Sequence, residues 1–147
     1  MRRNGPDPAH RGLPLLIRLA RQAADERRGE VARAEALVAE VRAALDRHER
    51  RVEAEGRAAV DPGARAAYPG WIRHAARYRA DLATQLERAE REEARRRDAL
   101  RDAFAATKRL ELAAAGAEAE TVRCAARRAQ AVAEEQAGLR RAAAEEP

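Results

Sequence analysis

Apolar residues recur along most of this chain at steps that alternate between three and four positions. In the first half the stripe runs through Leu13, Ile17, Ala20, Ala24, Arg27, Val31, Ala34, Val38, Val41, Leu45, His48 and Val52. In the second half it runs through Trp71, Ala75, Tyr78, Leu82, Gln85 or Leu86, Ala89, Glu92 or Glu93, Arg96, Leu100, Ala103, Thr107, Leu110 and Ala114. Such steps keep one face of a helix against a partner helix. The pattern therefore predicts two long helices, each with one narrow apolar seam.

A cluster of helix breakers separates the two stripes. It contains Asp61, Pro62, Gly63, Pro69 and Gly70, and no proline occurs from residue 71 to residue 143. We therefore predict a helix at 13–59, a turn at 60–70 and a second helix at 71–143. A short connection makes neighbouring helices antiparallel. The expected fold is all-α, a long antiparallel two-helix coiled-coil hairpin forming one domain over 13–143. Residues 1–12, which are rich in Gly and Pro, are predicted to be a disordered leader.

The turn also predicts which seam positions meet across the hairpin. The expected pairs are Val52 with Tyr78, Leu45 with Leu86, Val31 with Leu100, and Ile17 with Ala114. The same register places Val38 beside Glu93, so polar groups enter the middle of the seam. Polar seam residues can fix the register, or they can simply lay their aliphatic stems along the seam. The sequence leaves both interpretations open.

The second helix is the longer one, so its C-terminal end is expected to overhang the first helix. Residues beyond about 118 then have no partner within the chain, and an isolated helix is marginal in water. This segment carries a weak apolar stripe formed by Val122, Ala125, Ala129, Val132 and Leu139. The stripe is either a surface for a partner helix or part of a fraying tail.

The start of the first helix lies at the same end of the predicted hairpin. Its apolar residues are Leu16, Ile17, Leu19 and Ala20, with Arg18 and Arg21 beside them. An apolar centre with charged groups at its rim is typical of protein interfaces. We therefore predict the main protein contact at this end of the hairpin.

Composition argues against an enzyme. Charged residues make up 37% of the chain and aromatic residues 3%, which is typical of long solvated helices and leaves little material for a pocketed core. Cys124 is the only cysteine, and the three histidines are scattered without metal-ligand spacing. We predict no catalytic, cofactor or metal site. No apolar run is long enough to span a membrane, so a cytoplasmic protein is expected.

The net charge of +5 raises the possibility of a nucleic-acid partner. Positive and negative side chains are interspersed along both helices, however, and no basic block with interleaved aromatic residues occurs. The Arg run at 95–97 is flanked by acids and is predicted to be a solvated face. We therefore predict no nucleic-acid partner.

Several residues in this framework resemble a known family. Leu16, Leu19, Ala20 and the pair Asp25 and Glu26 open the first helix, and Tyr68 and Trp71 mark the turn. Phe104 is followed by Lys108, Arg109, Leu110 and Glu111 on the second helix. Over about residues 13–141 this arrangement resembles the flagellar export protein family FliJ and, more distantly, the YscO-type proteins of virulence type III secretion.

The resemblance implies a soluble component of the bacterial flagellar type III protein export apparatus that supports flagellum assembly and motility. FliJ-like proteins form an antiparallel two-helix coiled coil similar to the central stalk of rotary ATPases. They engage the hexameric export ATPase, contact the membrane export gate, and help to deliver export chaperones and substrates. This implies a cytoplasmic protein held peripherally at the cell membrane, without direct membrane insertion. The alternative is a structural coiled-coil scaffold or adaptor unrelated to export.

Overall fold

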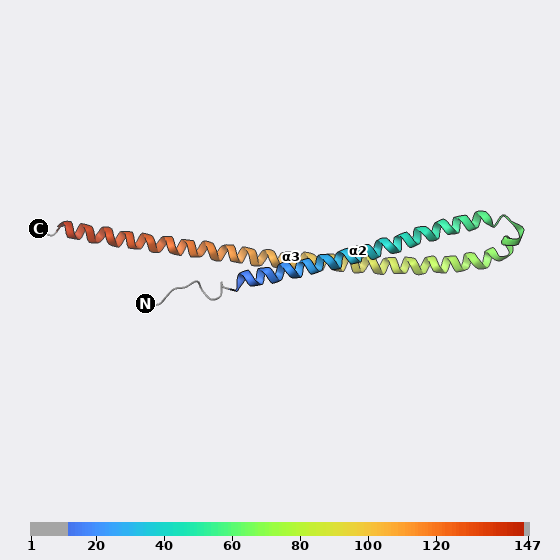
Figure 1. The fold of residues 1–147 in the computed structure, drawn as a ribbon, viewed down its shortest axis with the longest axis horizontal. Coiled ribbons are helices and arrows are strands. Elements are labelled where there is room, and N and C mark those ends of the chain that lie inside the picture. The colour runs from blue at the N-terminus through green and yellow to red at the C-terminus, as the bar shows by residue number, and fades with distance from the viewer. Residues whose placement is uncertain (1–11, 146–147) are drawn as a thin grey trace. The chain divides into compact units, whose positions relative to one another are not determined.

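Two helices make up the fold of residues 12–145, the part of the chain that the computed structural model describes (Figure 1). α2 spans Leu13–Ala58 and has 46 residues, and α3 spans Pro62–Glu145 and has 84 residues. The helices are in contact and form an antiparallel hairpin, so the predicted all-α hairpin is confirmed. Apart from Gly12, the predicted leader at residues 1–12 lies outside the described residues.

The first helix begins directly at its apolar segment. The Leu16 amide donates a hydrogen bond to the Gly12 carbonyl oxygen at 3.0 Å. Pro14 lies in the first turn of α2, where an amide N–H is not needed for helical hydrogen bonding and where its fixed φ suits the helix. The leucines that follow are therefore held in helical geometry from the first turn onward.

The turn is shorter than the predicted 60–70, and that prediction is wrong in its extent. Only residues 59–61 are non-helical, so α2 ends at Ala58, not residue 59, and α3 runs from Pro62 to Glu145, not from 71 to 143. The reason is local. Asp61 precedes the helix, its carbonyl oxygen accepts the Arg65 amide at 3.0 Å, and Pro62 occupies the first helical position that proline favours.

Pro69 lies inside α3, although it was expected to interrupt the helix. A proline in a helix interior costs about 3 kcal/mol, because it removes one hydrogen bond and crowds the preceding turn. Two features on either side of it favour the helix. Tyr68 and Trp71 stack with ring centroids 5.9 Å apart. The Tyr68 hydroxyl also packs over Gly56 of α2, at 3.2 Å from where a Cβ would stand. The aromatic contacts thus offset part of the cost of Pro69.

Two compact units divide the chain. The turn unit consists of residues 23–103 and contains the end of α2 and the first part of α3. The terminal unit contains the start of α2, up to Gln22, and α3 from Phe104 onward. Within the turn unit the two helices run side by side on either side of the turn (Figure 1).

The core of the turn unit is a line of small and medium apolar side chains. Its buried members are Ala24, Val31, Val38, Val41, Ala75, Leu82 and Ala89. Most of them recur at intervals of seven residues, which is the repeat of a coiled-coil seam. In this unit the predicted stripes are buried or half-buried except at Arg27, Tyr78 and Gln85, which are exposed. The seam was therefore predicted correctly at most of its positions.

Ion pairs between the helices of the turn unit establish the register. As residue numbers rise on α2, the partners' numbers fall on α3: Glu35 with Arg97 at 2.9 Å, Arg42 with Glu90 at 2.6 Å, and Glu49 with Arg79 at 3.0 Å. Descending order of this kind requires antiparallel helices. These pairs are exposed, so each contributes little to stability. Their value is in showing which helix faces meet.

The Arg run at 95–97 is largely exposed, as predicted for a solvated face, but two of its three side chains also bridge the helices. Arg96 and Arg97 both reach across to α2, where they pair with Glu30 and Glu35 at 2.9 Å. Arg97 also holds Glu93 at 2.8 Å, and the Glu93 side chain is only 16% exposed. Arg96 and Arg97 thus span the gap between the helices, whereas Arg95 pairs with Glu92 of its own helix. This arrangement favours the interpretation in which polar residues help to fix the register.

Glu30 lies in this polar network between two arginines, one from each helix. It accepts hydrogen bonds from Arg27 at 2.8 Å and from Arg96 at 2.9 Å. The hydrogen bond from Arg27, followed by the one from Arg96, holds the pKa of Glu30 below its ordinary value of 4.5. A carboxylate with a lowered folded-state pKa stabilises the fold above its unfolded-state pKa, and that contribution disappears as the pH falls through the folded-state value.

We expect Glu30→Gln to lower the melting temperature at pH 7, and we expect the difference from the unchanged protein to shrink as the pH falls below 4.5. Thermal unfolding followed by circular dichroism between pH 7 and pH 2 measures this difference. Glu53→Gln is the control, because it removes only an exposed ion pair to Arg57 on the same helix. A Glu30→Gln difference that stays constant over this pH range would show that the ionised carboxylate does not stabilise the turn unit.

Candidate partner-binding surface

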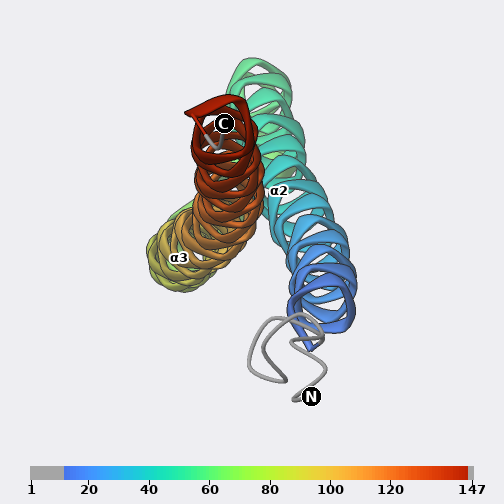
Figure 2. The same cartoon turned by 90° about the vertical axis from the view of Figure 1, so that its left-hand side faces the viewer.

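The start of α2 lies beside α3 in the terminal unit, as Figures 1 and 2 both show. Leu13 and Pro14 line a shallow hollow of about 280 Å³ together with Ala114, Ala117, Glu118 and Thr121 of α3. α2 therefore begins at the level of Thr121. α3 continues from there to Glu145. We call the segment 122–145 the overhang, and its existence agrees with the predicted unequal helices.

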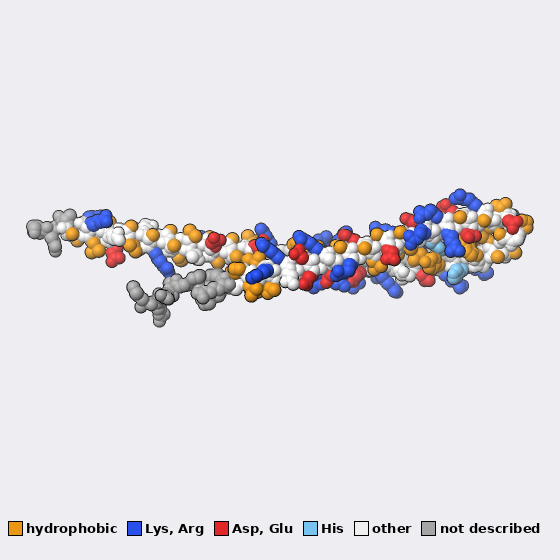
Figure 3. All heavy atoms as spheres, viewed as in Figure 1, with side chains coloured by type: hydrophobic (Ala, Val, Ile, Leu, Met, Phe, Trp, Pro, Cys, Tyr) orange, Lys and Arg blue, Asp and Glu red, His pale blue; other side chains and the backbone are white. Residues whose placement is uncertain are grey.

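Three leucines at the start of α2 form an exposed apolar surface. Leu15, Leu16 and Leu19 are each between 48% and 51% exposed. Steps of three and four residues place them on one face of the helix. Figure 3 shows hydrophobic side chains gathered over these first turns of α2. We call these three residues the leucine patch.

The four residues predicted for this surface divide between two faces. Leu16 and Leu19 belong to the leucine patch, whereas Ile17 and Ala20 are half-buried. Ile17 and Ala20 continue the seam positions of α2, so their main role is to pack against α3. Sequence reasoning missed Leu15. Leu15 is not a seam position and lies four residues before Leu19, so the helical repeat places it on the same exposed face as Leu19.

The predicted stripe on the overhang is exposed throughout. Val122, Val132 and Leu139 are between 53% and 66% exposed, and Ala125 and Ala129 are exposed as well. A monomeric protein rarely leaves a regular apolar stripe uncovered unless something binds to it. The stripe begins where α2 begins, but Leu139 lies about 25 Å farther along α3 at the usual rise per residue. The stripe thus starts just beyond the α3 residues that lie beside Leu13 and Pro14, and it extends away from them along α3.

Two arginines lie near the leucine patch, and one of them pairs with α3. Arg21 pairs with Glu111 of α3 at 2.6 Å, and this hydrogen bond, together with the charge of Lys108, holds the pKa of Glu111 below its usual value. Arg21 therefore joins the two helices. Arg18 has no ion-pair partner among the described residues and lies next to the leucine patch. It is the cation at this surface that is available to a partner.

The opposite side of the overhang carries a local charge cluster. Glu120 pairs with Arg123 at 3.0 Å and with Arg127 at 3.3 Å, and Arg127 contacts the Cys124 sulfur at 3.1 Å. The hydrogen bond from Arg127 is the main reason why the pKa of Glu120 is lowered. On a coiled-coil repeat these positions face away from the one that begins at Val122. The overhang therefore has an apolar side and a charged side.

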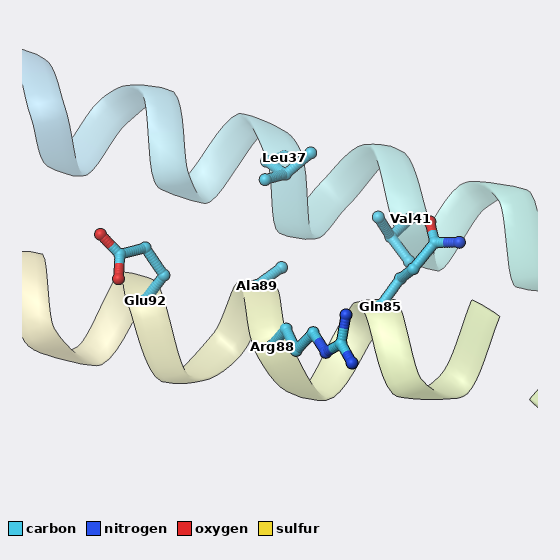
Figure 4. A pocket seen from close by; sticks show the side chains of 6 residues that line it. All are labelled: Leu37, Val41, Gln85, Arg88, Ala89 and Glu92. Carbon is cyan, nitrogen blue, oxygen red and sulfur yellow. The ribbon is translucent and has the colours of Figure 1, made fainter. Parts of the chain in front are cut away.

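The turn unit has a hollow of its own, shown in Figure 4. It measures about 280 Å³ and is lined by Leu37 and Val41 of α2 and by Gln85, Arg88, Ala89 and Glu92 of α3. The short Ala89 side chain faces Leu37 and Val41 without filling the space between the helices (Figure 4). Ligand pockets are usually larger and enclosed. This hollow is a shallow gap in the seam.

Protein contact is the role that these surfaces fit best, because their groups are apolar stripes with charged rims. Within residues 12–145, no cluster of His, Cys, Asp and Glu side chains is arranged to hold a metal ion. Over the same range, neither helix has a stretch apolar and long enough to cross a bilayer. Comparison with known proteins finds no match: no family model, no curated protein and no solved structure is significantly similar to this chain.

Proposed function

We propose that this chain is a coiled-coil component of the bacterial flagellar type III export apparatus and that it binds the hexameric export ATPase. The observation that carries the proposal is the pair of exposed apolar surfaces in the terminal unit, the leucine patch and the overhang stripe, next to a two-helix hairpin. These features accompany the residues that resemble the FliJ family. A helical segment with an uncovered apolar side is suited to insertion among the subunits of a ring.

The two surfaces would contact the ATPase in different ways. The leucine patch supplies a compact apolar contact with Arg18 at its edge, which is the composition of an interface hot spot. The overhang supplies a longer contact whose helix is stabilised by binding. Contact with the export gate and with export chaperones, and a position at the cytoplasmic face of the membrane, also belong to this proposal.

The test is capture of the flagellar export ATPase from the same organism. The double variant Leu16→Asp and Leu19→Asp should weaken capture at least about tenfold, because two charges would enter an apolar contact. Both leucines are about half exposed, so the variant should keep its helical content and melting temperature. Titration of the ATPase would give the affinity, and circular dichroism would give the helical content and the melting temperature.

Leu37→Asp provides the matched control. Leu37 is 49% exposed on the same helix but belongs to the turn unit. It should leave capture unchanged. Equal loss of capture in both variants would contradict the assignment of the contact to the terminal unit. If the unchanged chain does not bind the ATPase at all, the alternative of a scaffold or adaptor unrelated to export replaces the proposal.

A further inference from the structure

We propose that the overhang pairs with the overhang of a second copy of this chain, in antiparallel orientation, to form a symmetric two-stranded coiled coil. The exposed stripe consists of the five apolar residues predicted from sequence, and Gln136 fills the gap between Val132 and Leu139. With Gln136 included it runs Val122, Ala125, Ala129, Val132, Gln136 and Leu139, with steps that alternate strictly between three and four. That is the repeat of a coiled-coil seam over most of the overhang.

The stripe is complementary to itself when it is reversed. The seam of the repeat has two positions, a and d, and in an antiparallel pair each a residue faces a d residue of the partner helix. Aligning Val122 of one copy with Leu139 of the other also aligns Ala125 with Gln136 and Ala129 with Val132. Every large apolar residue then faces an apolar residue across the two-fold axis, and small alanines in the middle allow the helices to approach closely. Gln136 faces only the small side chain of Ala125, so its amide can reach the edge of the seam.

Charges next to the seam support the same alignment. In this register Arg128 of one copy lies beside Glu135 of the other, and the two-fold axis repeats the pair. Both side chains are exposed, and within the described part of the chain neither has an ion-pair partner. Arg127, by contrast, already pairs on the outer side of the helix with Glu120, just before the overhang. Arg128 and Glu135 are therefore among the charges of the overhang that an antiparallel partner could pair, and this register joins the two.

A parallel pair of overhangs fits less well. It would stack Gln136 against Gln136 and Val122 against Val122, and it would leave Arg128 opposite Ala133. The antiparallel pair satisfies both Arg128 and Glu135. This inference is independent of the proposed function. If the overhang binds both the ATPase and a second copy of the chain, these two partners compete for its apolar side.

Charge exchange tests the pairing. We expect sedimentation of the full chain over a concentration series to show a monomer–dimer equilibrium. Arg128→Glu alone, or Glu135→Arg alone, should weaken the dimer about tenfold or more, because two attractive contacts become repulsive. The double exchange Arg128→Glu with Glu135→Arg should restore it, and a mixture of the two single variants should form mixed dimers. A chain that stays monomeric at every concentration, or a double exchange as weak as the single variants, would overturn the proposal.

Cysteine cross-linking tests the orientation. In a Cys124→Ala background, Val122→Cys chains mixed with Leu139→Cys chains should form a disulfide between the two variants, since these positions face each other only in the antiparallel pair. Each variant alone should remain unlinked, because its two cysteines would then be about 25 Å apart. Cross-linking of each variant with itself would show a parallel pair and would contradict the proposed alignment.

Discussion

Replacing Val38 with Asp should lower the free energy of unfolding by about 2–4 kcal/mol, which is a large part of the stability of a small fold. Val38 is 3% exposed in the core of the turn unit, so the new carboxylate would be taken out of water. Arg97, which reaches α2 at Glu35, already pairs with Glu35 and Glu93. Thermal and chemical unfolding followed by circular dichroism measures the loss.

The neighbouring residue supplies the control. Leu37 precedes Val38 on the same helix but is 49% exposed at the edge of the seam, so Leu37→Asp should lower the free energy of unfolding by only about 1 kcal/mol. The two variants carry the same new charge at adjacent positions, and helix propensity alone would make Leu37→Asp the costlier of the two, so a larger loss in Val38→Asp must come from burial. Similar losses in both would mean that the buried face of α2 has been assigned wrongly.

The seam of this protein was predictable because its signal is periodic. Val31 and Val38 on α2, and Leu82 and Ala89 on α3, are buried where alternating steps of three and four placed them. A two-helix hairpin has only one face per helix to bury, so the period alone locates the core. Neither the identity of the partner helix nor fine packing detail is needed for that inference.

The turn could not be placed from sequence in the same way. Pro69 normally marks the end or the start of a helix, and the prediction followed that rule. The helix continues through it in the presence of the stacked pair Tyr68 and Trp71 and the close approach of Tyr68 to Gly56. These are contacts between residues brought together by the fold. Local propensity contains no information about them.

The candidate surface was only partly predictable for a related reason. Sequence placed Leu16, Ile17, Leu19 and Ala20 together, because all four are apolar and close in the chain. Burial separates them: Leu16 and Leu19 are exposed, whereas Ile17 and Ala20 are half-buried. For the same lack of cross-helix information, the sequence did not predict that Arg96 and Arg97 also pair with Glu30 and Glu35 of α2.

Truncation after Thr121 should abolish capture of the export ATPase and cell swimming in a strain that lacks the full chain. The cut keeps every residue that lines the hollow with Leu13 and Pro14, and it removes the overhang with its exposed stripe. The apolar core of the turn unit lies outside the removed segment. The melting temperature should therefore change little, while the helical signal falls in proportion to the residues removed. Circular dichroism of both chains checks this.

The affinity of the truncated chain for the export ATPase tests the central claim most directly, namely that the overhang is a partner-binding helix. Titrating the hexameric ATPase with the full chain and with the chain ending at Thr121, both at concentrations where neither self-associates, measures it. The account predicts saturable binding by the full chain and none by the truncated chain. Equal affinity of the two chains would contradict it and would place the binding surface on the remaining hairpin.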